Sequence, residues 1–263
     1  MKKIKTVVHV HTNCCFDSNT SPEDLIATAR AAGVGCIAVT DHDEIAGAVA
    51  ARELGGGVRI IVGEEITTTE GHVIGLFLEE RIPPGLTPEE TAQRIRAQGG
   101  LVLAAHPFAT LCQHSLNHAA MERLLPWLDA VEVCNAQNLL WWESGWARRY
   151  AAKHGLTPFV GDDAHIRGHL AACHQIMPAF DGPADFLSAL RQAELHTGWF
   201  APDYYLAMGL QHTWINLLGM SLAGFGVNAP GGQAARADEQ PTTKPAFALA
   251  TGSESTPGGE KRA

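Results

Sequence analysis

Several common features are missing from this sequence of 263 residues, and each absence removes a class of protein. Its six cysteines show no CxxC spacing, and the N-terminus MKKIKTVVHVH lacks the apolar core of a secretory signal peptide. These two absences predict a reduced, cytoplasmic protein. Neither a GxSxG elbow nor a phosphate-binding P-loop occurs, so the sequence offers no recognisable side-chain nucleophile.

Positive charge is also scarce in this chain. The formal net charge is −9 and the sequence pI is about 5.8, which argues against a broad surface for duplex nucleic acid and against binding to anionic membranes. The uncharged stretch 204–225 is largely apolar, but Gln211, His212 and Asn216 interrupt it, so a buried or partner-facing helix fits better than a membrane span. We therefore expect no membrane span, and an oligomer contact through 204–225.

Short apolar runs alternate with helical patterns along most of the chain. Ser21 and Pro22, followed by acidic residues, predict a capped helix start, and Thr87 and Pro88 repeat the pattern. No helix is evident within 58–78, so we expect a hairpin-like or irregular connection there. The apolar runs predict seven strands, at 6–11, 36–40, 58–62, 72–78, 101–105, 130–134 and 158–161.

Strands that alternate with helices indicate a parallel sheet, and seven such strands suffice to close a barrel. The predicted fold is therefore an α/β, TIM-like (β/α)7 barrel over residues 1–203, followed by an apolar helical extension over 204–227. The chain then turns to Gly, Pro, Ala, Thr and Glu with few large apolar residues, which predicts a disordered tail over 228–263.

Two strand ends each carry a pair of candidate metal ligands. Alternate residues of a strand point to the same face, so His9 and His11 can approach one cation, and so can Asp163 and His165. By the same rule Asp162 points away, which favours Asp163 as the ligand. Further histidines and carboxylates lie at the ends of other apolar runs, at Asp41, His42, Glu64, Glu65, His72 and His106. This clustering predicts a polynuclear metal site at the carboxyl ends of the strands.

Most single histidines have an ordinary structural role. That role is assigned to His114, His118, His154, His169, His174, His196 and His212. The histidines at the strand ends are different, because burying their imidazoles and the neighbouring carboxylates in one barrel mouth would leave polar groups unpaired. Each unpaired group costs roughly 1 to 3 kcal/mol. Bound metal would remove that cost.

Six segments of the chain resemble, in order, the motifs of the PHP (polymerase and histidinol phosphatase) metallophosphoesterases. The segments are HVHTNCCFD, TDHDEIAG, GEEI, HVIGL, AAHPF and DDAH, and the resemblance covers about residues 4 to 200. The segment at the fourth strand resembles the short, stand-alone phosphoesterases of the family. The resemblance implies a distorted seven-stranded barrel of the PHP type with two or three divalent ions, and the ligand types suit zinc, manganese or iron.

Matching the chain to the family motifs implies three sets of metal ligands, with one carboxylate bridging the first and second ions. The sets are His9, His11, Glu65 and Asp163 for the first ion, Glu65, His72 and His106 for the second, and Asp17, His42 and His165 for the third. The choice of Glu65 over Glu64 rests on the Gly-x-Glu pattern of the family alone.

Other polar residues beside these ligands have predicted supporting roles. Asp41 either orients an imidazole or caps the helix that begins near Glu44. Asn135 and Glu132 end the sixth strand, where the family often has a polar residue near the substrate. Arg167 is a candidate for gripping phosphate, because guanidinium matches phosphate oxygens, although an exposed loop arginine is the simpler explanation.

The cysteines fall into two groups by position. Cys14 and Cys15 follow His11 closely, so either could approach the metals, but no spacing rule supports them as ligands. Cys36 and Cys134 sit inside apolar runs, which favours small core residues.

These features predict metal-dependent hydrolysis of a phosphate ester, either a phosphomonoester or a short nucleotide phosphodiester, by a metal-activated hydroxide at a trinuclear site. The expected substrates are small phosphorylated metabolites, nucleotides and short oligonucleotides. Two alternatives stay open, an amidohydrolase-type hydrolase and a non-catalytic, metal-stabilised binding module. Amidohydrolases also use an HxH strand but usually need a carboxylated lysine or an equivalent bridge, and no lysine ends a predicted strand here.

Overall fold

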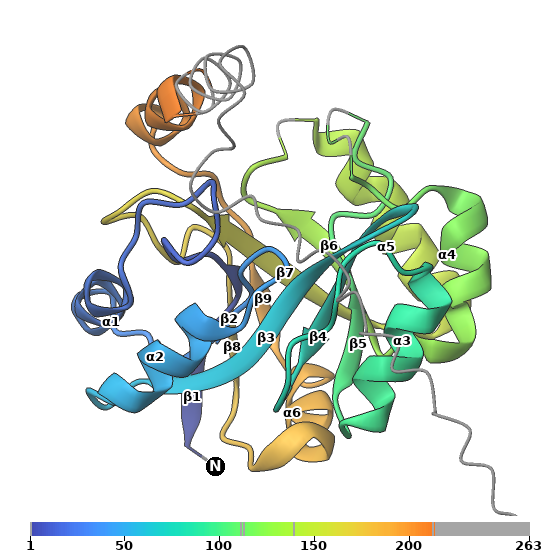
Figure 1. The fold of residues 1–263 in the computed structure, drawn as a ribbon, viewed down its shortest axis with the longest axis horizontal. Coiled ribbons are helices and arrows are strands. Elements are labelled where there is room, and N and C mark those ends of the chain that lie inside the picture. Colours follow the sequence, from blue (N-terminus) through green and yellow to red (C-terminus); the bar gives the residue numbers. More distant parts are fainter. Residues whose placement is uncertain (1, 111, 113, 139, 212, 214–263) are drawn as a thin grey trace, which may run out of the picture.

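The computed structural model describes residues 2–110, 112, 114–138, 140–211 and 213, and strands surrounded by helices dominate it (Figure 1). The strands are β1 Lys3–Val10, β2 Cys36–Val39, β3 Arg59–Thr68, β4 Gly71–Leu76, β5 Leu101–Ala104, β6 Ala130–Asn135, β7 Thr157–Ala164, β8 His174–Pro178 and β9 Glu194–His196. The helices are α1 Pro22–Ala31, α2 Ala46–Leu54, α3 Pro88–Ala97, α4 His118–Leu124, α5 Trp141–His154 and α6 Gly182–Leu190, with a 3-10 turn at Leu125–Trp127.

Seven strands form a closed ring, which confirms the predicted α/β barrel. Hydrogen-bonded neighbours follow the order β2-β3-β4-β5-β6-β7-β1, and β1 pairs again with β2 to close the ring. Strands β8 and β9, which the sequence did not predict, extend from β1 outside the ring, and β8 pairs antiparallel with the first half of β1. They escaped prediction because they are short and β8 is only half-buried.

The ring is mixed rather than wholly parallel, so that part of the prediction is wrong. Strand β4 runs antiparallel to both β3 and β5, whereas the other ring pairings are parallel. The cause is the expected hairpin-like connection, which the structure confirms as a tight turn between Thr68 and Gly71. Because β4 is reversed, its beginning lies at the rim where parallel strands end, and His72 is carried to that rim.

Apolar residues pack in two layers. One cluster joins strand residues such as Val8, Ile74 and Phe159 to Phe186 of α6, and helix α6 lies across one end of the strands (Figure 1). The other cluster joins the opposite strand faces to the helices around the ring. The barrel interior is therefore closed at the α6 end, and its polar residues collect at the other rim.

Both predicted helix starts are confirmed by their caps. The Ser21 side chain accepts a hydrogen bond from the backbone N–H of Asp24 at the start of α1. Thr87 and Glu90 form a reciprocal capping box at the start of α3.

Residues 202–211 are helical, and this stretch packs onto the barrel. Its Tyr204 and Met208 are buried in the outer core cluster. The predicted extension thus begins as a helix, while its remainder over 214–227 and the tail predicted over 228–263 lie outside the described residues. No helix of the described part of the chain is both long and apolar enough to cross a membrane. The predicted domain limits stay predictions.

Candidate metal centre

The predicted metal ligands meet at one rim of the barrel. They reach it from the ends of β1, β5 and β7, from the loop after β2, from within β3 and from the start of the reversed strand β4. All of them are buried except His42, which is half-buried. The side chains gathered there are His9, His11, Asp17, His42, Glu65, His72, His106, Asp163 and His165.

The first predicted set is brought together as one group. The candidate ligand atoms of His9, His11, Glu65 and Asp163 all lie within 4.8 Å of one another. His11 Nε2 is 3.3 Å from Glu65 Oε2 and 3.3 Å from Asp163 Oδ1, and His9 Nε2 is 3.0 Å and 3.5 Å from the same two oxygens. Two imidazoles and two carboxylates therefore converge on one point.

The third predicted set also forms one group, with His11 added. Asp17 Oδ2 lies 3.3 Å from His42 Nε2 and 3.4 Å from His165 Nε2. The rings of His11 and His165 stack with their centroids 4.0 Å apart. Because His11 belongs to both the first and the third group, the two candidate ion positions are neighbours.

The second predicted set is brought together around one oxygen of Glu65. His72 Nδ1 and His106 Nε2 each lie 2.9 Å from Glu65 Oε1. The compact group at this point is His42, Glu65 and His72, however, because His42 Nδ1 lies 3.3 Å from Glu65 Oε2. Glu65 thus contacts histidines of all three sets, and His42 lies nearer to the second position than the sequence suggested.

The donors at this rim fit divalent cations. Two ligands held at about 2.1 Å by one tetrahedral ion lie about 3.4 Å apart, and most contacts between the imidazoles and the carboxylates measure 3.3 to 3.5 Å. Those distances are longer than a good hydrogen bond. In addition, His11 Nε2 is fully buried without a hydrogen-bond partner. Imidazole nitrogens and carboxylate oxygens suit zinc, manganese and iron.

In the absence of metal, ion pairing governs the protonation of this cluster. Burial opposes ionisation of Glu65, but His9, His72 and His42 outweigh it and hold its pKa well below the usual value. Burial likewise opposes protonation of His42, yet the carboxylates of Glu65 and Asp17 raise its pKa to about 9. The cluster is therefore built from charges that stabilise one another, and a cation would replace the protons on the imidazoles.

Backbone distortion directs several of these side chains inward. His9, His106 and Asp163 have φ angles of 69°, 25° and 53°, in the left-handed region that such residues seldom adopt. At His9 the register of β1 slips against both β2 and β7 between Val8 and Val10. This bulge lets Val8 pack in the interior while Val10 packs in the outer cluster. His9 and His11 consequently both reach the rim.

Glu132 forms hydrogen bonds with residues that supply candidate ligands. Its Oε1 lies 2.9 Å from His9 Nδ1, and its Oε2 accepts hydrogen bonds from the His106 backbone N–H and from Asn135 Nδ2. Asn135 Nδ2 also donates to Asp163 Oδ2 at 2.9 Å. Both residues thus contact groups that carry the candidate ligands, and their expected position near the substrate stays a prediction. Such partners fix the tautomer and orientation of a ligating imidazole.

A glycine makes room for this arrangement. A Cβ atom at Gly161 would lie 1.4 Å from Glu132 Oε1 and 3.3 Å from His9 Cβ. We expect Gly161→Ala to displace the Glu132 carboxylate and weaken zinc affinity by about 10 to 100-fold, measured by competition with a chromogenic chelator. Gly145→Ala is the control, because the nearest atom to its new Cβ is 3.8 Å away. Unchanged zinc affinity in Gly161→Ala would show that Glu132 does not support the ligands.

Asp41 is engaged by the loop after β1. Its carboxylate accepts hydrogen bonds from the Thr12 backbone N–H and from Thr12 Oγ1. The predicted capping of the next helix is wrong, because Glu44 Oε1 accepts from the backbone N–H groups of Ile45, which precedes α2, and of Ala46, its first residue. Asp41 lies in a group with His11 and Cys15 within 4.8 Å, so an effect on the His11 imidazole stays a prediction.

Arg167 and the cysteines occupy different positions relative to the rim. Arg167 is exposed and pairs with Asp24 of α1 at 2.9 Å, so its predicted contact with phosphate gains no support from its present partner. Cys15 Sγ donates to Asp17 Oδ1 at 3.2 Å, whereas Cys14 is exposed. Cys36 is fully buried in the interior core, as expected.

Two residues that sequence reasoning missed also support the rim. Tyr204 Oη donates to the Asp163 carbonyl at 3.0 Å and accepts from the His165 backbone N–H at 3.2 Å. Gln137 Nε2 donates to the same carbonyl and lies 3.0 Å from His165 Nδ1. Gln137 lies two residues after Asn135, which is a weak signal, and nothing in the sequence pairs Tyr204 with β7.

A sequence profile described as PHP domain matches residues 8–139, half of the chain, and one described as PHP-associated matches 144–195. An uncharacterized protein of Methanocaldococcus jannaschii is 40% identical over 146 residues, which are 51% of this chain and 82% of that protein. The phosphoribosyl 1,2-cyclic phosphate 1,2-diphosphodiesterase of Eggerthella lenta is 37% identical over 84 residues, 29% of this chain and 32% of that enzyme.

A solved structure shares the fold. It is a two-domain protein from Bacteroides vulgatus described as containing a predicted PHP-like metal-dependent phosphoesterase. The superposition has a TM-score of 0.61 at 17% sequence identity, and it covers 75% of this chain and 65% of that chain. At this identity the likeness concerns the fold alone. The profile match over half of its length establishes that the chain belongs to the PHP family.

Proposed function

We propose that this protein is a metal-dependent phosphoesterase that hydrolyses a phosphate ester at a site for three divalent ions. The observation that carries the proposal is the sharing of side chains between groups of ligand atoms. His11 belongs to the first and third groups, and Glu65 and His42 connect the remaining pairs. Ions held by these groups would be neighbours, as cooperative action on one phosphate requires.

When bound, the divalent ions supply Lewis acidity and an acidified water for attack on phosphorus. The residues of the chain set the tautomer and the orientation of the side chains that would bind these ions. Glu132 at 2.9 Å from His9 Nδ1 favours the tautomer that leaves Nε2 free to bind a cation. Asn135 holds one oxygen of Asp163, so the other oxygen faces His9 and His11.

The proposed substrate class rests on the candidate metal ligands at the rim and on the name of one relative. The Eggerthella lenta enzyme is named for action on a cyclic phosphodiester. We infer that a small phosphorylated metabolite, a nucleotide or a short oligonucleotide is the substrate here, cleaved as a mono- or diester. We further propose that the metal is zinc, manganese or iron. The catalytic barrel would span residues 1–203, and the protein would be cytoplasmic.

The amidohydrolase alternative lacks support in the geometry. Glu65 belongs to two of the groups of candidate ligand atoms, so it could bridge two ions without a carboxylated lysine. Lys5, on the first strand, donates to the Ala32 carbonyl. A carboxylate can itself bridge ions, so the alternative is tested by substrate class rather than by inspection.

Assays with chromogenic substrates test the proposal. We expect Mn²⁺-dependent hydrolysis of bis(4-nitrophenyl) phosphate or 4-nitrophenyl phosphate, and no hydrolysis of 4-nitroacetanilide or a lactone. Asp163→Asn should remove the activity, because Asp163 faces His9 and His11. Asp162→Asn should retain it per folded molecule, because Asp162 accepts from the backbone N–H groups of Ala171 and Cys173 on the other side of β7.

The remaining outcomes contradict the proposal in distinct ways. Hydrolysis of the amide or the lactone without the phosphoesters would indicate an amidohydrolase. Tight metal binding with no hydrolysis of any of these substrates would favour the binding module. Equal activity in the two aspartate variants would remove Asp163 from the site.

A further inference from the structure

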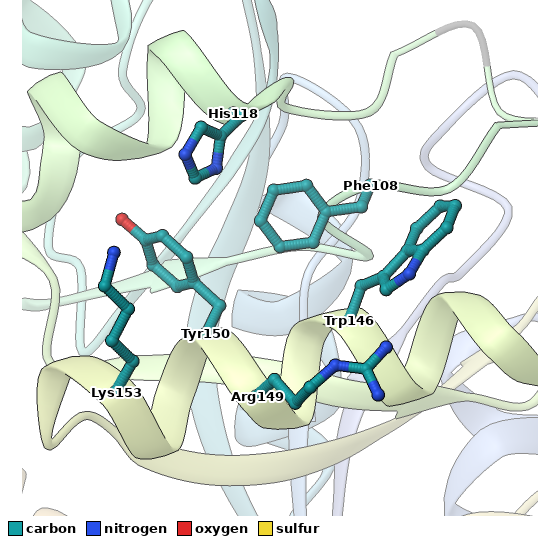
Figure 2. A pocket seen from close by; sticks show the side chains of 6 residues that line it. All are labelled: Phe108, His118, Trp146, Arg149, Tyr150 and Lys153. Carbon is teal, nitrogen blue, oxygen red and sulfur yellow. The ribbon is translucent and has the colours of Figure 1, made fainter.

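A pocket of about 340 Å³ lies outside the candidate metal centre, between the start of α4 and one face of α5 (Figure 2). Its volume falls within the usual range of small-molecule sites, roughly 300 to 1,000 Å³. Most of the lining is aromatic, and the rest is cationic. The lining residues are Phe108, His118, Trp146, Arg149, Tyr150 and Lys153.

Helix periodicity places the α5 side of the pocket on a single stripe. Trp146, Arg149, Tyr150 and Lys153 are spaced at i, i+3, i+4 and i+7, so they share one face of α5. Figure 2 shows Trp146, Tyr150 and Lys153 directed from the helix toward Phe108 and His118, while the Arg149 side chain runs along the helix beside Trp146. The aromatic and the charged side chains of α5 therefore line the same pocket.

The aromatic wall is preformed. The Phe108 ring centroid lies 5.6 Å from that of Tyr150 and 6.2 Å from that of His118. The Tyr150 hydroxyl donates to the Met121 carbonyl at 3.0 Å, which fixes its ring. Trp146 is 44% exposed, a large apolar surface left open at the edge of the pocket. A flat ring entering here would meet Trp146 and the half-buried Phe108, whereas Tyr150 is only 5% exposed and supports the wall.

The two strong cations of the pocket have no carboxylate partner of their own among the described residues, although Glu122 Oε1 lies 3.7 Å from His118 Nε2 of the same lining. Within the described part of the chain, the side chains of Arg149 and Lys153 form neither an ion pair nor a hydrogen bond, whereas Arg123 of α4 pairs with both Glu70 and Glu89. In a chain with a net charge of −9, two unpaired cations beside one pocket favour an anionic ligand.

One short segment with unusual backbone angles contributes residues to both this pocket and the candidate metal centre. Phe108 has a φ of 67°, unusual for a bulky residue, and its N–H donates to the Leu116 carbonyl at 3.2 Å. It lies two residues after His106, whose carbonyl accepts a hydrogen bond from Ser115 Oγ. One segment thus places His106 at the candidate metals and Phe108 at the pocket.

We propose that this pocket binds a nucleoside monophosphate unit, with the base among the aromatic side chains and the phosphate beside Arg149 and Lys153. Aromatic stacking accepts the flat face of any base, and the cations supply the charge that a phosphate needs. The unit is either the non-reacting part of a nucleotide substrate, which rests on the proposed function, or a separate effector. Both sources share this binding chemistry.

Calorimetry with AMP on chelator-treated protein tests the site without turnover. We expect AMP to bind, and ribose 5-phosphate and adenosine each to bind at least about tenfold more weakly, because each lacks one half of the recognised chemistry. Trp146→Ala, and Arg149→Gln combined with Lys153→Gln, should each weaken AMP binding by about tenfold. Arg148→Gln is the control, since Arg148 is an exposed neighbour that does not line the pocket.

The remaining results decide the question in other ways. Ribose 5-phosphate binding as tightly as AMP would reduce the pocket to an anion site, and unchanged affinity in folded Trp146→Phe and Trp146→Ala alike would exclude the aromatic contact. Either result overturns the proposal whether or not the protein hydrolyses phosphoesters. With metal restored, a raised KM of Trp146→Ala for a dinucleotide but not for 4-nitrophenyl phosphate assigns the site to the substrate. Equal changes for both substrates assign it to an effector.

Discussion

The Glu65→Gln variant is expected to lose most of its bound metal and at least about 1,000-fold of its phosphoesterase activity, beyond the 10 to 100-fold typical of residues that only support ligands. Glu65 Oε1 contacts His72 and His106, and Oε2 contacts His9, His11 and His42. A glutamine retains one oxygen but turns an NH₂ group toward imidazoles that would otherwise face a carboxylate. Metal content by mass spectrometry and activity at saturating Mn²⁺ measure the effect.

Glu64→Gln is the matched control for that substitution. Glu64 is the adjacent residue and equally buried, but it faces the other side of β3, where its Oε2 accepts from the Ile82 N–H at 2.8 Å. Burial raises the pKa of Glu64 to about 8, so at pH 7 it is largely a neutral acid, which glutamine resembles in shape and charge. We expect normal metal content. Equal losses in the two variants would refute the central position of Glu65.

Local patterns in the sequence were enough to place two pairs of candidate ligands together. Alternation along a strand places His9 with His11 and Asp163 with His165 regardless of how the strands pair. The same rule separates Asp162 from Asp163, and the structure gives Asp162 backbone partners away from the rim. The residues nearest the expected ions were thus identifiable, because their spacing within one strand determines their direction.

Relations between strands could not be predicted in the same way. A hairpin-like connection after β3 was expected, but that expectation did not show that the reversed strand β4 would bring His72 to the rim. The position of Glu132 behind His9 depends on Gly161 of β7 and on register slips in β1 and β6. A bulge has no reliable signature in one sequence, because the residues around it remain apolar and β-branched.

Contacts from distant segments were the least predictable. Tyr204 begins a stretch that looked like a separate apolar helix, yet its hydroxyl bonds to the backbone at Asp163 and His165. Gln211, farther along the same helical stretch, donates to the Asp17 carbonyl. Composition could indicate that this stretch is buried, but only the fold shows that it rests on the loops that carry candidate ligands.

Removing metal should change how the stability of this protein depends on pH. Although burial opposes their charging, the carboxylates around His9 and His42 raise the pKa of both, to about 9 for His42. A raised histidine pKa contributes stability that is complete below about 6.5 and is lost as pH rises through the folded value. Burial opposes ionisation of Glu65 and Asp163, but the histidines lower their pKa, so their contribution is complete above about 4.5 and is lost in acid.

The chelated protein should therefore melt at its highest temperature between about pH 4.5 and 6.5, and its Tm should fall toward pH 9 as His42 and its neighbours lose their protons. Zinc competes with those protons, so the gain in Tm on adding zinc should be larger at pH 8 than at pH 6. At pH 8 and about 100 times the Kd, the gain should be about 5 to 10 °C. Scanning fluorimetry with EDTA or zinc measures both curves, with Glu65→Gln as the variant expected to gain little. An equal zinc effect at the two pH values would mean that imidazoles are not the groups that exchange protons for metal.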